Sequence, residues 1–232
     1  MPPYVRAVQV SSEISDMLIA DAALTVAFAL IFTGGLSSFS LSAFVYFLPI
    51  SLVAVSLSFI LHEYMHKKVA QHFGAMAAFK RWDSGIAITL ISSLFGFLIG
   101  LPGATMIYSD RFTTEEEGYV SLAGPLTNFV VFIAFLLLSV FGSGFLAGAY
   151  AQKMIGVTMF ISVWLAFFNM LPIYPLDGSK VLRWNKGVYA VTMLTIFAFL
   201  YYVAGASILP SLIFVLIIAL AMSFMYRGIM RF

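Results

Sequence analysis

The sequence contains no cysteine and very little charge. Without cysteine, the chain can form neither disulfides nor thiolate metal sites. Charged residues make up 9% of the 232 residues and hydrophobic residues 62%, whereas globular proteins average about 25% charged residues. The net charge of +2 is too small to indicate nucleic-acid binding, and no basic arm is present. These features predict a polytopic membrane protein embedded in the lipid bilayer.

Long polar stretches are also missing. We therefore expect a single membrane-embedded domain over residues 1–232, without an appended soluble domain. Residues 1–17 lack the apolar core of a cleaved signal peptide and contain Glu13 and Asp16. The first apolar segment is accordingly expected to serve as the targeting signal and to be retained. Nothing in the sequence indicates an oligomeric state.

Six apolar segments are long enough for a helix that crosses a bilayer, which needs about 20 residues. They cover residues 18–35, 43–66, 119–141, 154–172, 188–206 and 209–226. The fold is thus predicted to be all-α, with about six transmembrane helices.

A seventh apolar segment, residues 85–108, carries glycine and proline, which break regular structure. If this segment does not cross, eleven of the twelve Lys and Arg residues lie on one side of the membrane, and only Lys153 lies on the other. If it crosses, they divide six and six. Because cytoplasmic loops are enriched in Lys and Arg, we expect both termini to be cytoplasmic and 85–108 to be re-entrant or interfacial.

The most informative motif is His-Glu-x-x-His at residues 62–66, at the end of an apolar segment. In a helix this spacing places His62 and His66 on one face, where they can bind zinc, with Glu63 beside them as a general base. The alternative is a polar cluster at a helix end whose side chains reach toward water. Ionisable residues within a membrane segment, however, favour a functional site.

A catalytic zinc site takes three protein ligands, so a third residue is needed. His72 follows six residues after His66, which on a continuing helix directs it to a different face. Asp177 is the better candidate, because Pro172, Pro175 and Gly178 interrupt the helix around it. Asp177 could instead cap the N-terminus of the following helix.

Three motifs together resemble those of the site-2 proteases, which are intramembrane zinc metalloproteases. The first is the His-Glu-x-x-His run, followed by Gly74. The second is Ala-Gly-Pro-Leu-Thr-Asn at residues 123–128, and the third is Asn-x-x-Pro-x-x-Pro-Leu-Asp-Gly at residues 169–178. The resemblance covers about residues 43–185 and implies a catalytic core of three helices there, with segments 18–35, 188–206 and 209–226 outside it.

The resemblance also implies the site residues and the reaction. One zinc ion per chain would be held by His62, His66 and Asp177, with Glu63 as the base. Asn128 and Asn169 match motif asparagines, which could bind the substrate backbone or an oxyanion, or could join helices. The reaction implied is cleavage of a transmembrane segment in another membrane protein. A strand-forming segment is implied between the second and third spans, compatible with a β-hairpin at 85–108.

The orientation places both chemical motifs at cytoplasmic helix ends, so we expect the active site near the cytoplasmic side of the cell membrane. Two other functions agree less well with the sequence. A transporter should show internal repeats and ionisable residues in several spans, and neither pattern is evident. An inactive relative that only binds membrane proteins is disfavoured, because every residue required for the chemistry is present.

Overall fold

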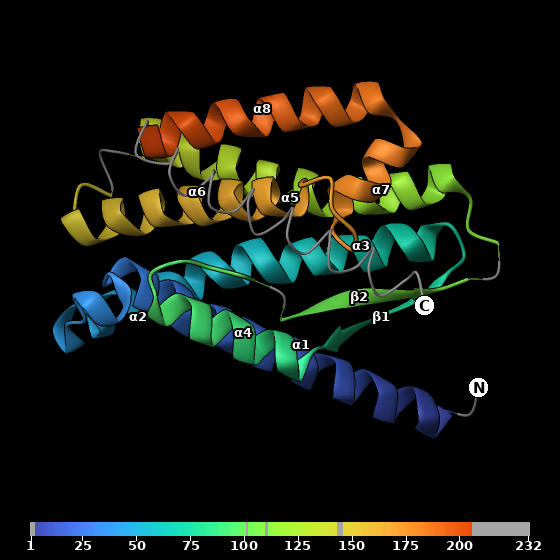
Figure 1. The fold of residues 1–232 in the computed structure, drawn as a ribbon, viewed down its shortest axis with the longest axis horizontal. Helices are drawn as coiled ribbons and strands as arrows, with labels where there is room; N and C mark the ends of the chain where they lie inside the picture. Colours follow the sequence, from blue (N-terminus) through green and yellow to red (C-terminus); the bar gives the residue numbers. More distant parts are fainter. Residues whose placement is uncertain (1–2, 101, 110, 143–145, 206–232) are drawn as a thin grey trace.

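The computed structural model describes residues 3–100, 102–109, 111–142 and 146–205, and it consists mainly of long helices lying side by side (Figure 1). By length and composition, five of these helices could cross a membrane. They are α1 (Pro3–Phe32, apolar from Ser12), the continuous run Leu41–His72, α5 (Thr114–Phe141), α6 (Ala149–Asn169) and α8 (Lys186–Ala204). They coincide with the first five predicted spans, and the predicted span 209–226 lies outside the described residues.

The second of these helices changes its winding halfway along. The run consists of α2 (Leu41–Val55), a π-helical turn η2 (Ser56–Ile60) and α3 (Leu61–His72). A π turn accommodates an extra residue, so it rotates the face that the following helix presents. Ser58 in this turn is hydrogen-bonded to Ser162 of α6 over 2.7 Å. The turn therefore sets the direction in which the residues of α3 project.

The remaining elements are short. They are the 3-10 turn η1 (Gly35–Ser37), the strands β1 (Met76–Arg81) and β2 (Gly103–Tyr108), and the helices α4 (Asp83–Leu94) and α7 (Asp177–Trp184). The two strands pair antiparallel, with Phe79 opposite Thr105. Gly103 approaches β1 so closely that a Cβ atom there would lie 2.5 Å from the carbonyl oxygen of Lys80.

The sheet lies between the second and third spans, where a strand-forming segment was expected, but it is not confined to residues 85–108. Only β2 lies in that segment, whereas β1 precedes it and the first part of the segment is helical. The reason is the position of the helix-breaking residues. Gly96, Gly100, Pro102 and Gly103 all follow α4, so the apolar run before them continues as a helix. The depth of this segment in the membrane stays a prediction.

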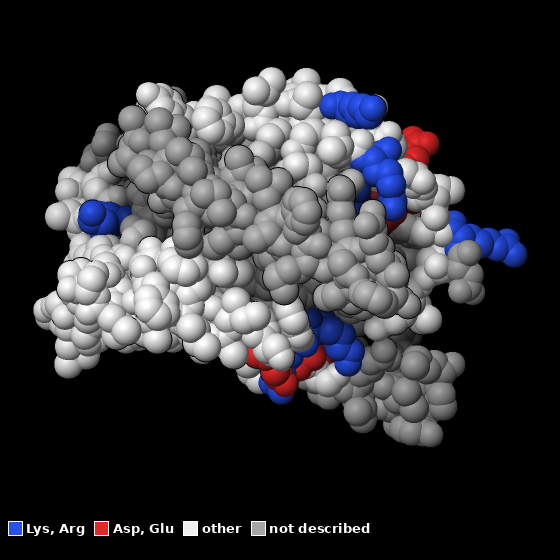
Figure 2. Space-filling view, in the orientation of Figure 1, with Lys and Arg blue, Asp and Glu red and all other residues white. Residues whose placement is uncertain are grey.

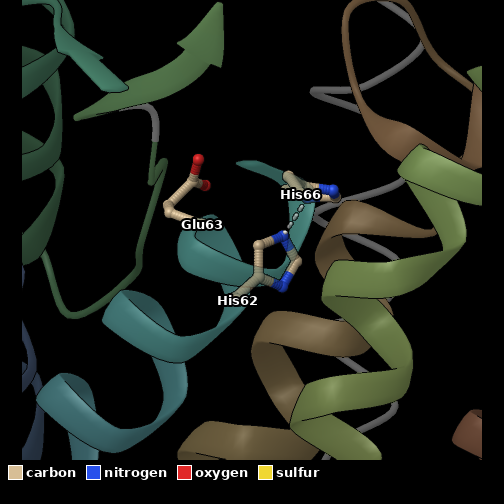
Figure 3. Close-up of side chains that lie close together, drawn as sticks. All are labelled: His62, Glu63 and His66. Carbon is tan, nitrogen blue, oxygen red and sulfur yellow. Dashed lines mark hydrogen bonds between the residues drawn. The ribbon is translucent and has the colours of Figure 1, made fainter. Parts of the chain in front are cut away.

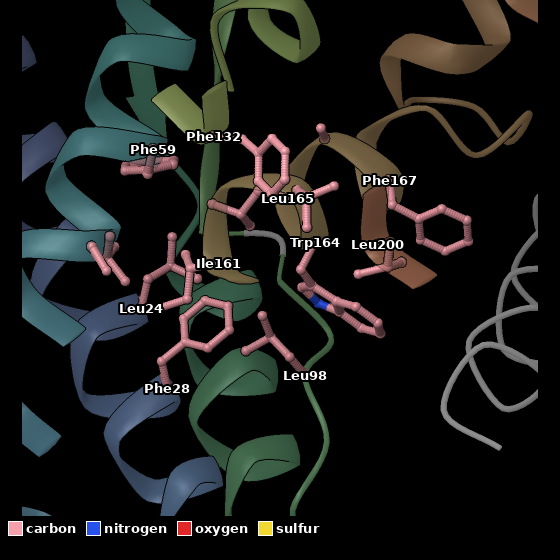
Figure 4. Packing of buried hydrophobic residues seen from close by; sticks show 14 of the residues in the cluster. Leu24, Phe28, Phe59, Leu98, Phe132, Ile161, Trp164, Leu165, Phe167 and Leu200 are labelled. Carbon is pink, nitrogen blue, oxygen red and sulfur yellow. The ribbon is translucent and has the colours of Figure 1, made fainter. Parts of the chain in front are cut away.

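Helix α5 occupies the centre of the arrangement and packs against α3, α6 and α7, while α1 packs against α2, α4 and β1. The hydrophobic core lies between these helices, with α6 at its middle (Figure 4). Phe28 of α1, Phe132 of α5 and Leu200 of α8 are among its fully buried members. This packing holds α3, α5 and α7 together at the end of the molecule where the first and third motifs meet.

Charged side chains gather at that same end on the face shown in Figure 2, near β1, β2 and α7, and a separate basic group lies at the opposite end, where α6 begins. Lys153 is in the first turns of α6. The orientation of the chain in a membrane stays a prediction.

Glu13 of α1 ties the N-terminal helix to both α3 and the sheet. Its carboxylate accepts hydrogen bonds from Lys67 Nζ at 2.7 and 2.8 Å and from the Phe79 backbone N–H at 3.1 Å. Glu13 is buried, so removing it would leave a donor and an ammonium group without their acceptor.

We expect Glu13→Ala to lower the thermal unfolding temperature of the detergent-purified protein by several degrees, corresponding to about 1–3 kcal/mol. Glu13→Gln keeps an acceptor for the Phe79 N–H, so its unfolding temperature should fall less than that of Glu13→Ala. Thermal unfolding of the two variants and the unaltered protein tests this, and an unchanged midpoint in Glu13→Ala would contradict the importance of this contact.

Candidate metal centre

Three electron-pair donors converge where α3 meets α7. Nε2 of His62 and Nε2 of His66 lie 2.9 Å apart (Figure 3). Oδ2 of Asp177 lies 3.3 Å from the first nitrogen and 3.1 Å from the second. All three residues are buried. The structure thus brings together two histidines that are adjacent on one helix and an aspartate more than a hundred residues away.

These distances fit a zinc ion. Tetrahedral zinc with bonds of about 2.0–2.1 Å keeps its ligand atoms about 3.3 Å apart, close to the three separations observed. Three electron-pair donors facing one another in a buried place are stable only if they share a positive charge, which either a metal ion or a proton on a histidine can supply. Two imidazoles and one carboxylate are the donor set of many catalytic zinc sites.

Helix α5 determines how the His66 ring is presented. The Val120 carbonyl oxygen lies 2.7 Å from Nδ1 of His66 and accepts its proton, which leaves Nε2 free as a ligand. Gly124, one turn further along α5, gives the rings their room. A Cβ atom there would lie 2.5 Å from Nε2 of His62 and closer still to Nε2 of His66. The glycine of the second motif is therefore required by the space that an ion would occupy.

Asp177 is the first residue of α7 and is delivered by the turn that follows α6. Gly178 lets this turn fold tightly, because a Cβ atom there would lie 2.6 Å from the Leu171 carbonyl oxygen and closer to that of Met170. The alternative role of Asp177 as a helix cap is not observed, since Leu176 is the N-cap and no side chain caps α7. Burial raises the pKa of Asp177, but the adjacent His66 and His62 outweigh it and hold the pKa well below its ordinary value.

Glu63 projects in a different direction from its two histidine neighbours (Figure 3). Its Oε2 accepts hydrogen bonds from the backbone N–H of Thr105 at 2.9 Å and from the Thr105 hydroxyl at 2.8 Å. A carboxylate oxygen of Glu63 nevertheless lies within 4.8 Å of a ring nitrogen of each histidine. Glu63 therefore lies beside the centre, but its carboxylate is held by Thr105 and is not one of the three nearest donors.

A cavity of about 460 Å³ opens onto these groups. It is lined by His62, Glu63, His66 and Asp177, by residues Gly103 to Ile107 of β2, and by the turn before α7. The candidate metal ligands and residues of β2 thus line the same cavity.

The two motif asparagines occupy different places. Asn169 lines the cavity, and its Nδ2 donates to the Leu165 carbonyl oxygen of its own helix over 3.0 Å. Asn128 is fully buried in α5, and its amide has no hydrogen-bond partner among the described residues.

His72 ends α3 with its ring against Phe73 rather than against the cluster. Three residues that contact the candidate site were not predicted from the sequence: Thr105, Val120 and Gly124. Gly124 nevertheless stands in the second motif.

Comparison with known proteins finds relatives that are named as zinc metalloproteases. The chain is 41% identical over 193 residues to a protein of Methanocaldococcus jannaschii named as a zinc metalloprotease. The aligned region covers 82% of this chain and 93% of that relative. The chain is also 29% identical over 161 residues to a similarly named protein of Bacillus subtilis, covering 59% of this chain and 68% of that one. No family model matches the sequence. No solved structure matches it either.

The chain belongs to the family of zinc metalloproteases that these relatives represent. Several of the relatives carry zinc in their names, which supports zinc as the cofactor expected from the sequence.

Gly124→Ala should abolish tight zinc binding, because the added methyl group would clash with the candidate ligand nitrogens of both histidines. Titration with zinc against a chelator of known affinity measures the effect, and we expect a loss of at least about 100-fold. Gly156→Ala on α6 is the matched control, since a Cβ atom there meets nothing within 4 Å. Equal zinc affinity in the two variants would contradict the placement of the ion beside α5.

Proposed function

We propose that the protein is an intramembrane zinc metalloprotease of the site-2 protease type, which hydrolyses peptide bonds within or near transmembrane segments of other membrane proteins. The observation that carries the proposal is the convergence of His62, His66 and Asp177. The two histidines lie on a helix of membrane-spanning length, and Asp177 follows the turn after another such helix, α6. The three sequence motifs and the membership of a zinc metalloprotease family support the proposal.

In this proposal His62, His66 and Asp177 hold the zinc ion. When bound, zinc lowers the pKa of a coordinated water to about 7 and polarises the substrate carbonyl. Glu63 accepts the proton of the attacking water and passes it to the leaving amine. In the structure its Oε2 accepts two hydrogen bonds from Thr105, whereas Oε1 accepts none from the described residues. Asn169, on the cavity wall, is the better placed of the two asparagines to bind substrate.

The substrate is proposed to be a transmembrane segment that unwinds locally, since the peptide bonds of an intact helix are shielded by its own turns. An unwound segment can add as a strand to the edge of β2, which borders the cavity. Strand addition satisfies the backbone hydrogen-bonding groups that unwinding exposes, and these groups are costly to leave unpaired in a membrane.

The proposed orientation has both termini in the cytoplasm and the site near the cytoplasmic side of the cell membrane. Its support is the distribution of Lys and Arg, together with the gathering of charged side chains at the end of the molecule that carries β2 and α7 (Figure 2). Water would then reach the site from the cytoplasmic side.

Glu63→Gln should bind zinc as the unaltered protein does and lose cleavage by about 10²–10⁴-fold, because the amide cannot accept the proton. The assay uses purified protein in liposomes and single-span reporter proteins with Gly and Pro at the centre of the helix. Glu115→Gln, at the start of α5 and away from the cavity lining, is the matched control. Full activity in Glu63→Gln, with cleavage lost in His62→Ala, would refute the role given to Glu63.

A further inference from the structure

Among the described residues, the sheet has one outer edge that a substrate strand could join, the edge of β2. The outer edge of β1 faces α1, where the Phe79 N–H already donates to the buried carboxylate of Glu13. Phe79 pairs with Thr105, and the Thr105 N–H points away from β1 to Glu63. Backbone groups alternate in direction along a strand, so the N–H groups of Gly103, Thr105 and Ile107 all lie along the outer edge of β2.

The middle one of these three donors is occupied. The Thr105 N–H donates to Glu63 Oε2 at 2.9 Å, and the Thr105 hydroxyl donates to the same oxygen at 2.8 Å and approaches the Glu63 carbonyl oxygen at 3.1 Å. A strand that paired along the whole of β2 would need the Thr105 N–H for one of its own carbonyl groups. Substrate and Glu63 therefore compete for one donor.

We propose that Thr105 is a positioning residue that holds Glu63 against β2 until an unwound substrate strand takes the Thr105 N–H and releases the carboxylate for its role as the base. This inference rests on the proposed function. It makes the release of the base a consequence of strand pairing, so that a substrate bound without pairing leaves Glu63 held. The threonine hydroxyl stabilises the held state only, because that contact is given up in the complex.

The side chain can be tested apart from the backbone N–H. Thr105→Val removes the hydroxyl and keeps the shape, whereas Thr105→Ser keeps the hydroxyl. A hydrogen bond to a charged group contributes about 1.4 kcal/mol or more, equivalent to a factor of about ten in binding. We therefore expect Thr105→Val to bind substrate about tenfold more tightly, and Thr105→Ser to behave like the unaltered protein. Thr195→Val is the matched control, since that hydroxyl bonds within α8.

The probe is a fluorescein-labelled, leucine-rich peptide of about 24 residues, long enough to span a bilayer, with Gly-Pro at its centre. Fluorescence anisotropy on chelator-treated protein measures affinity without cleavage, and KM and kcat are measured on the zinc-loaded protein. Tighter binding and a lower KM in Thr105→Val, with kcat within about twofold, is the expected result. A peptide N-methylated around Gly-Pro cannot pair as a strand, and its weak affinity should be the same for all variants.

Two results would overturn the proposal. One is equal affinity of the Val variant and the unaltered protein. The other is a lower kcat in Thr105→Val that Thr105→Ser restores, because Thr105 would then orient Glu63 in the productive complex. Failure of the peptide to bind any variant, or equal binding of the N-methylated peptide, would instead contradict strand addition and hence that part of the proposed function.

Discussion

The convergence of three electron-pair donors in a buried place is the constraint on which the rest of the structure depends. Nε2 of His62, Nε2 of His66 and Oδ2 of Asp177 lie within 3.3 Å of one another. Such a cluster is unfavourable without a cation, so the surrounding packing must hold it in place. Three features hold the donors in place. They are the π turn before α3, the absence of a side chain at Gly124 of α5, and the tight turn before α7.

Helix α3 connects the candidate metal centre to the sheet within a single turn. His62 and Glu63 are adjacent in sequence, yet one side chain faces Asp177 and the other reaches Thr105 of β2. The candidate base is thereby shared between the place where an ion would bind and the edge where a peptide could pair. In the proposed function, this arrangement couples substrate pairing to the chemistry, and the hydrophobic packing of α5 against α3 keeps the geometry fixed.

The sequence predicted the features that depend on local patterns. Five apolar runs became helices of membrane-spanning length, and the His-Glu-x-x-His spacing placed two histidines on one face. Asp177 was found because prolines and glycine interrupt the helix beside it. The strand limits and the roles of Thr105 and Gly124 escaped prediction. They depend on contacts between distant positions, such as Thr105 with Glu63, 42 residues away, which no local pattern encodes.

The most direct test of the account is the metal content of detergent-purified protein, measured by mass spectrometry for the unaltered chain, His62→Ala and Asp177→Ala. The account predicts about one zinc ion per chain in the unaltered protein and a large loss in both variants, because each removes one of three ligands. A folded, unaltered protein that binds no zinc after reconstitution, or an Asp177→Ala variant that binds zinc as tightly as the unaltered chain, would contradict it.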